Sequence, residues 1–67
     1  MSECAECRLY KAMVEELVAV QVGYKTLITL YQQHNTAGML DTLNDIHAHA
    51  GCYEALRQQL RALRRTR

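Results

Sequence analysis

Apolar residues recur along this 67-residue chain at alternating steps of three and four, and this spacing constrains the fold more than any other feature. The first series is Tyr10, Met13, Val14, Leu17, Val20, Tyr24, Leu27, Ile28 and Tyr31. The second series is Met39, Leu43, Ile46, Ala50, Tyr53, Leu56, Leu60 and Leu63. Such steps place side chains on one face of an α-helix, whereas alternation with period two is not sustained anywhere. The sequence therefore predicts an all-α fold of two amphipathic helices.

A break at residues 34–38 separates the two series. Asn35 tolerates the left-handed conformation that ends helices, and Thr36 is a suitable N-cap for the next one. The expected bounds, in a single domain over 1–67, are about 5–34 for the first helix, 35–38 for the turn and 39–65 for the second helix. A connection this short predicts an antiparallel hairpin in which the numbers of facing residues sum to roughly 70. Because Gly23 costs a helix about 1 kcal/mol, we expect the backbone of another helix to approach closely there.

The apolar stripes are wider than the contact between two helices can cover. A chain of this length buries only about 60% of the surface that it exposes when unfolded, so its stability alone is marginal. We therefore expect a homodimer that forms a four-helix bundle, or the docking of another protein, and both remain open. The residues predicted to form the protein interface are Tyr10, Val14, Leu17, Tyr24, Ile28, Leu30, Tyr31, Leu40 and Tyr53.

The cysteines suggest a possible metal site. Cys4 and Cys7 form a CxxC motif, which is half of a zinc site, a redox pair, or simply two small residues in a first helical turn. His49 and Cys52 share a helix face, so two copies of each would supply four zinc ligands in a two-fold dimer. Because cysteine also behaves as a small hydrophobic residue, we expect no cofactor and keep a zinc-bridged structural dimer as the alternative.

The C-terminal part is basic, although the net charge of the chain is only +1. The arginines at helical spacing there are Arg57, Arg61, Arg64 and Arg65. They suit phosphate contacts, an acidic protein partner, or a helix end whose charges offset the dipole and the acidic N-terminal part.

The expected hairpin resembles the Rop family of plasmid copy-number regulators. The resemblance covers residues 8–65 in length, two-helix arrangement, tight turn and cytosolic dimer, and residues 43–50 are loosely similar to the second helix of that family. It implies a dimeric RNA- or DNA-binding regulator, for which the C-terminal arginines are the candidate contacts. No RNA-contacting residue of the family is carried over to the first helix.

The sequence does not predict an enzyme. Ser2 is the only serine, and the adjacent Glu15 and Glu16 diverge by about 100° on a helix, so neither a nucleophile–base pair nor a carboxylate pair is present. The near-apolar run at 17–22 is too short to span a membrane, and the acidic N-terminal part does not resemble a signal peptide. We expect a small cytoplasmic interaction module, of a kind common among phage, plasmid and bacterial genes. It would act as an adaptor, chaperone or inhibitor of a larger protein through an exposed apolar helix face, with no small-molecule substrate.

Overall fold

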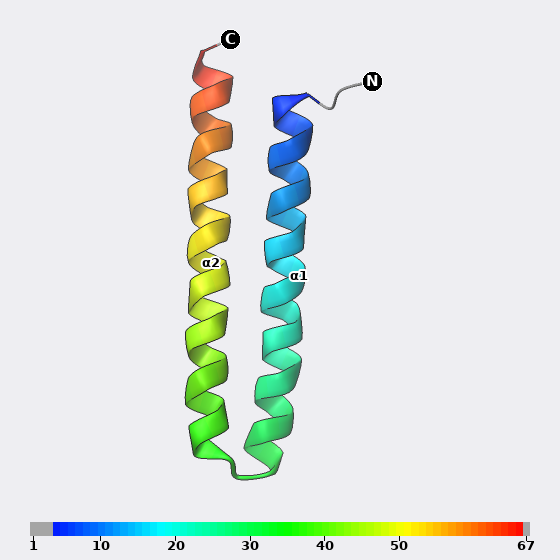
Figure 1. The fold of residues 1–67 in the computed structure, drawn as a ribbon, viewed down its shortest axis with the longest axis vertical. Helices are drawn as coiled ribbons and strands as arrows, with labels where there is room; N and C mark the ends of the chain where they lie inside the picture. The colour runs from blue at the N-terminus through cyan, green and yellow to red at the C-terminus, as the bar shows by residue number, and fades with distance from the viewer. Residues whose placement is uncertain (1–3, 67) are drawn as a thin grey trace.

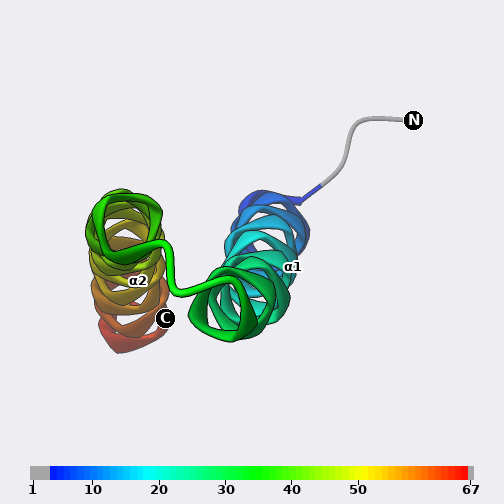
Figure 2. The ribbon, with the colours of Figure 1, turned by 90° about the horizontal axis from the view of Figure 1, so that it is seen from below.

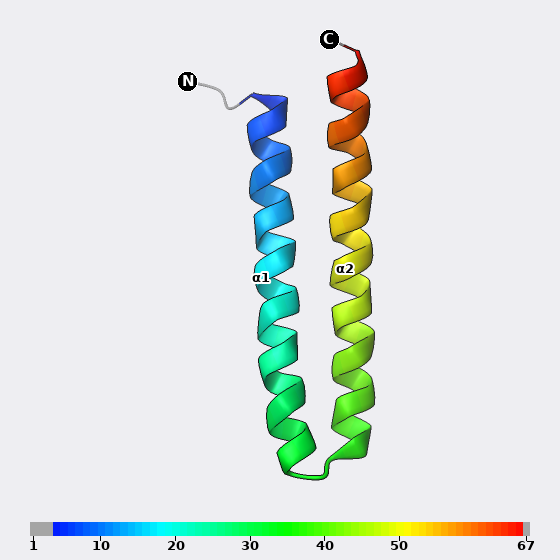
Figure 3. The ribbon, with the colours of Figure 1, turned by 180° about the vertical axis from the view of Figure 1, so that it is seen from behind.

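The computed structural model describes residues 4–66, which form two α-helices and no strand. Helix α1 covers Ala5–Gln32 and helix α2 covers Thr36–Arg65. The helices run antiparallel and side by side over their whole length, as opposite views show (Figures 1 and 3). The view along the helices shows a single layer (Figure 2), and the Cα extents of 50 × 23 × 11 Å agree. The predicted all-α helical hairpin is confirmed.

The turn is built differently from the sequence expectation. His34 is the residue with positive φ, at 56°, and the backbone N–H of the next residue donates to the carbonyl of Leu30 at 3.0 Å. This pattern is the Schellman ending of a helix. Asn35 is the N-cap of α2, because its side-chain oxygen accepts the N–H of Gly38 at 2.9 Å. Thr36 is therefore already helical, and α2 begins three residues earlier than expected.

The two helices touch along one heptad repeat from each, which we call the seam. On α1 the seam residues are Leu9, Met13, Glu16, Val20, Gly23, Leu27 and Leu30. On α2 they are Met39, Thr42, Ile46, His49, Tyr53, Leu56, Leu60 and Leu63. All are buried or half-buried, and the most buried are Met13, Ile46 and Leu60. A single line of contact between two cylinders buries few residues completely, which explains the small core.

The seam corrects the expected stripe on both helices. On α2, Leu43 and Ala50 were expected in the contact between the helices but are exposed. The residues just before them, Thr42 and His49, lie in the seam instead. On α1, the expected stripe splits. Its members Met13, Val20 and Leu27 lie in the seam, and the others are exposed: Tyr10, Val14, Leu17, Tyr24, Ile28 and Tyr31. Apolar character alone therefore did not select the contact face.

Gly23 lies where α2 packs closely on the middle of α1, but without the close backbone approach that was expected. A Cβ atom at this position would lie 2.6 Å from Cγ1 of Ile46, which is far inside van der Waals contact. The neighbour is a side chain rather than the backbone of α2. Ile46 therefore fills the space that the glycine leaves, and this fit helps to fix which faces of the two helices meet.

Among the described residues, neither helix has an apolar stretch long enough to cross a membrane.

Candidate interaction surface

A second heptad repeat runs along α1 and is not covered by α2. It consists of Tyr10, Val14, Leu17, Gln21, Tyr24, Ile28 and Tyr31, all of which are exposed. Each of these residues follows a seam residue by one position, so the repeat lies about 100° around the helix axis from the seam. Ile28 and Tyr31 are 59% and 68% exposed. We call this repeat, together with Leu40 and Leu43 of α2, the apolar face.

The contributions of α1 and α2 to the apolar face form one continuous surface near the turn. One shallow hollow is lined by Leu27, Ile28, Tyr31 and Met39. A second is lined by Thr36, Met39, Leu40 and Leu43. Leu40 and Leu43 each follow a seam residue by one position, as the exposed residues of α1 do, and in an antiparallel pair this displacement leads to the same side of the hairpin. The lining of both is almost entirely apolar in character, which suits contact with another apolar surface.

Most of the residues predicted to form the interface lie on the apolar face, but two do not. Leu30 and Tyr53 are half-buried in the seam, so they contribute to the contact between α1 and α2 instead. Val18 and Val22 are exposed and were not predicted. The sequence contained their signal, because both are β-branched apolar residues next to the first series, but they fall outside its steps of three and four.

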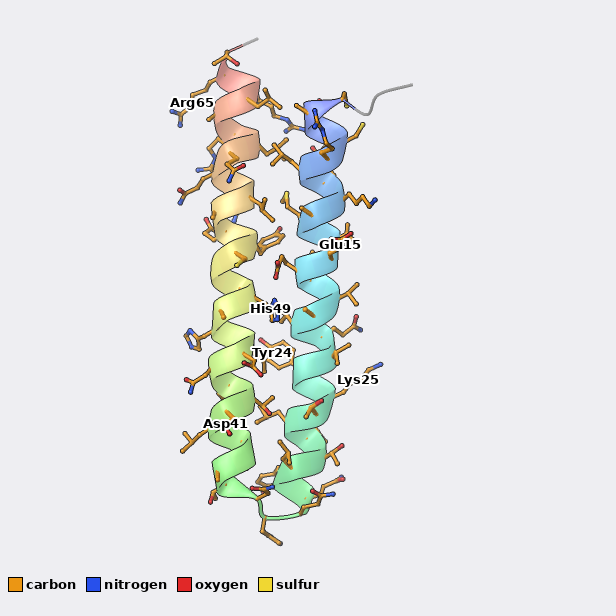
Figure 4. The ribbon with its side chains drawn as sticks, viewed as in Figure 1. Glu15, Tyr24, Lys25, Asp41, His49 and Arg65 are labelled. Carbon is orange, nitrogen blue, oxygen red and sulfur yellow. The ribbon has the colours of Figure 1, made fainter. Side chains whose placement is uncertain are left out.

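Near the chain ends the apolar face is followed by four arginines of α2, which we call the basic cluster: Arg57, Arg61, Arg64 and Arg65. Nη2 of Arg64 donates to the hydroxyl oxygen of Tyr10 at 2.6 Å, and Nε of Arg64 donates to Glu6 at 3.2 Å. Arg57 forms an ion pair with Glu54 at 3.6 Å. The four arginines singled out in the sequence therefore do not form one free stripe: two have acidic partners, and Arg65 points away from α1 (Figure 4).

A polar pair lies at the centre of the seam. Nδ1 of His49, which is labelled in Figure 4, lies 2.6 Å from a carboxylate oxygen of Glu16. The side chain of His49 is 43% exposed and that of Glu16 is 25% exposed. Each group satisfies the other in a position that is otherwise apolar, which removes the cost of leaving a half-buried polar atom unpaired. His49 was a candidate zinc ligand, but here its Nδ1 faces the carboxylate of the neighbouring helix.

The CxxC motif starts α1. Cys4 is the N-cap, and its Sγ accepts the backbone N–H of Cys7 at 3.2 Å while the two Sγ atoms are 2.6 Å apart. The hydrogen bond with the Cys7 side chain, followed by that from the Cys7 backbone, lowers the pKa of the Cys4 thiol. Cys52 is exposed in the middle of α2, whereas Cys4 and Cys7 lie at the start of α1.

The candidate zinc ligands do not meet in one chain. Residues 4–66 contain no group of three or more histidine, cysteine, aspartate or glutamate side chains arranged to hold a metal ion. A complete site would need donors from a second molecule, because structural zinc takes four ligands. Cys4 and Cys7 at one end and Cys52 in the middle would belong to different sites.

Comparison of the chain with known protein families, curated proteins and solved structures found no match. The expected resemblance to the Rop family stays a prediction.

Proposed function

We propose that this protein is a small protein-interaction module that acts through its apolar face. The observation that carries the proposal is the second, uncovered heptad repeat on α1, because it continues for the same length as the seam that holds the hairpin together. Scattered exposed apolar side chains are normal on soluble proteins, whereas a contiguous apolar surface marks an interaction site.

The chemistry of the apolar face favours a protein partner over a nucleic acid. Between Tyr10 and Tyr31 its repeat contains no charged residue, so it offers no cation to pair with phosphates. At its basic end, Arg57 and Arg64 already pair with glutamates of the same chain. An apolar surface with several tyrosines, whose hydroxyls tolerate the wet rim of an interface, is typical of protein binding sites.

The shape of the molecule favours binding over catalysis. The hairpin is a single layer with open, shallow hollows. Two near the turn are lined mostly by apolar side chains, and one beside Gly23 also has polar side chains, among them Asp45 and His49. A reaction needs polar groups that converge in a cleft. The one close polar pair within the seam, Glu16 with His49, is occupied in holding the two helices together.

Photo-crosslinking tests this proposal. Benzoylphenylalanine is placed at position 24 on the apolar face, and in a matched variant at position 25, whose Lys25 side chain points away from α2 (Figure 4). We expect protein adducts in the source cell from position 24 and few from position 25, because neighbouring residues lie about 100° apart on the helix. Equal labelling from both positions, or no protein adduct from position 24, would overturn the proposal.

A further inference from the structure

We propose that the apolar face is covered by a second copy of this chain, with α1 packed antiparallel on α1 of the partner and the two-fold axis passing beside Gln21. This inference rests on the proposed function, because it names the partner of the same surface. It also specifies an arrangement in which the two turns lie at opposite ends of a four-helix bundle.

The first argument is the symmetry of the exposed repeat on α1. Leu17 and Tyr24 flank Gln21, and the next pair outward is Val14 with Ile28. The outermost pair is Tyr10 with Tyr31. In an interface with two-fold symmetry, residue i contacts residue j of the partner and residue j contacts residue i. An axis at Gln21 therefore brings every apolar member of the repeat against another apolar member, and only the two Gln21 amides meet each other.

The second argument is the angle between the seam and the apolar face. In a four-helix bundle each helix contacts two neighbours, which lie in directions roughly perpendicular to each other. The apolar face on α1 is displaced from the seam by one residue, or about 100°. The exposed leucines Leu40 and Leu43 lie on the same side of the hairpin. The hairpin therefore presents an apolar surface on one side, along α1 and onto α2 near the turn, in the direction that a second pair of helices in such a bundle requires.

The third argument is the exposed area. The hairpin has an accessible surface of 5328 Å². A compact monomer of this mass is expected to expose about 4,300 Å², so the excess is about 1,000 Å². A standard stable interface removes about 800 Å² from each partner. A second copy on one side of the layer therefore accounts for the excess without any other partner.

The fourth argument concerns orientation. The arginine-rich ends of both copies lie at one end of the bundle if the two turns are at the same end. Turns at opposite ends separate the two basic clusters by the length of the hairpin, which removes their mutual repulsion. In the resulting bundle α2 also lies on α2 of the partner, and the small side chain of Ala50, which follows His49 of the seam by one position, allows the two helices to approach there.

A single engineered cysteine tests the position of the axis. Cys4, Cys7 and Cys52 are replaced by serine, and Gln21→Cys is introduced. Serine is itself a good N-cap and the three positions are exposed, so the helical hairpin is expected to persist, which circular dichroism checks. Under mild oxidation the Gln21→Cys chain should form a disulfide-linked dimer at least about tenfold faster than a matched Lys25→Cys chain, because only cysteines near the axis meet the distance limits of a disulfide.

The competing arrangement gives a different result. With both turns at the same end, α1 packs on α2 of the partner, and position 21 faces position 47. Cross-linking that needs a mixture of Gln21→Cys and His47→Cys chains would overturn the proposed axis. Sedimentation of the unmodified protein as a monomer at high concentration would overturn the second copy itself. In that case protein adducts from position 24 would still support the interaction module, so the two failures are distinguishable.

Discussion

The covered seam and the uncovered repeat of α1 have the same length and period but very different contents. The seam includes Glu16 and Gly23, whereas the uncovered repeat contains one polar residue, Gln21, among tyrosines and branched aliphatic residues. α2 thus packs on the repeat that contains a charged residue and a glycine, and not on the repeat that has neither. The difference teaches that the hairpin contact depends on the fit between specific side chains and not on apolar character alone.

Matched isoleucines on the two surfaces give the largest expected contrast. Ile46 is 6% exposed in the seam, and Ile28 is 59% exposed on the apolar face. We expect Ile46→Ala to lower the free energy of unfolding by about 2–4 kcal/mol, because it leaves a cavity beside Gly23. At low protein concentration we expect Ile28→Ala to change it by less than about 0.5 kcal/mol.

Denaturant titration at several protein concentrations measures both effects. If the apolar face is covered at high concentration, Ile28→Ala becomes destabilising there, since association adds to the stability of the folded state. A large loss for Ile28→Ala at every concentration would contradict the contrast between the two surfaces, because it would mean that Ile28 packs within a single hairpin.

The glycines in the middle of the two helices, Gly23 and Gly51, sharpen the comparison. Substitution by alanine should change the stability by less than Ile46→Ala does, and in opposite directions at the two positions. A methyl group at Gly23 would meet Ile46, whereas nothing lies within 4 Å of a Cβ at Gly51. We expect Gly23→Ala to destabilise the protein by about 1–2 kcal/mol, because overpacking outweighs the gain in helix propensity. Gly51→Ala should stabilise it by about 0.5–1 kcal/mol through propensity alone.

Thermal unfolding followed by circular dichroism compares the two glycine variants under identical conditions. A stabilising Gly23→Ala would show that the two helices do not approach closely at this point. A destabilising Gly51→Ala would show instead that a second molecule packs closely against the middle of α2, so this control also reports on the association.

The smallest expected effect concerns the thiols on the two helices. The pKa of Cys4 is lowered by hydrogen bonding with Cys7, so a larger fraction of Cys4 is thiolate at neutral pH. We expect iodoacetamide to modify Cys4 faster than Cys52 at pH 7, and the difference to shrink as the pH rises above the ordinary thiol pKa. Mass spectrometry of digested protein measures both rates. In Cys7→Ser, the rate at Cys4 should fall if the thiol of Cys7 is the main cause.

The sequence was sufficient to predict two helices, their antiparallel order and the place of the turn, because these follow from the apolar period and from the break at 34–38. It was not sufficient to choose between two repeats displaced by one residue. Both repeats have the same period, and the choice depends on Gly23 receiving Ile46 and on Glu16 pairing with His49. A prediction that follows apolar residues alone does not count glycine or charged residues, so it left out Gly23 and Glu16.

The turn shows the same limit. Asn35 was correctly placed at the break, but its role was assigned to the end of the first helix rather than to the start of the second. Both roles suit asparagine, and the decision depends on His34 adopting positive φ, which the residue type alone does not predict. For the interaction surface, exposure was predicted for most members, and the half-buried positions of Leu30 and Tyr53 follow from the same displacement of one residue.

The two ends of the hairpin, near Cys4 and Thr66, emerge side by side (Figure 1). A force applied between them acts across the helices rather than along them. It would load the contact of Glu6 with Arg64 first and then each following helical turn in succession. The two helices would therefore separate step by step from the chain ends, at low force. Two groups attached to the two ends would stay close together for as long as the hairpin stays closed.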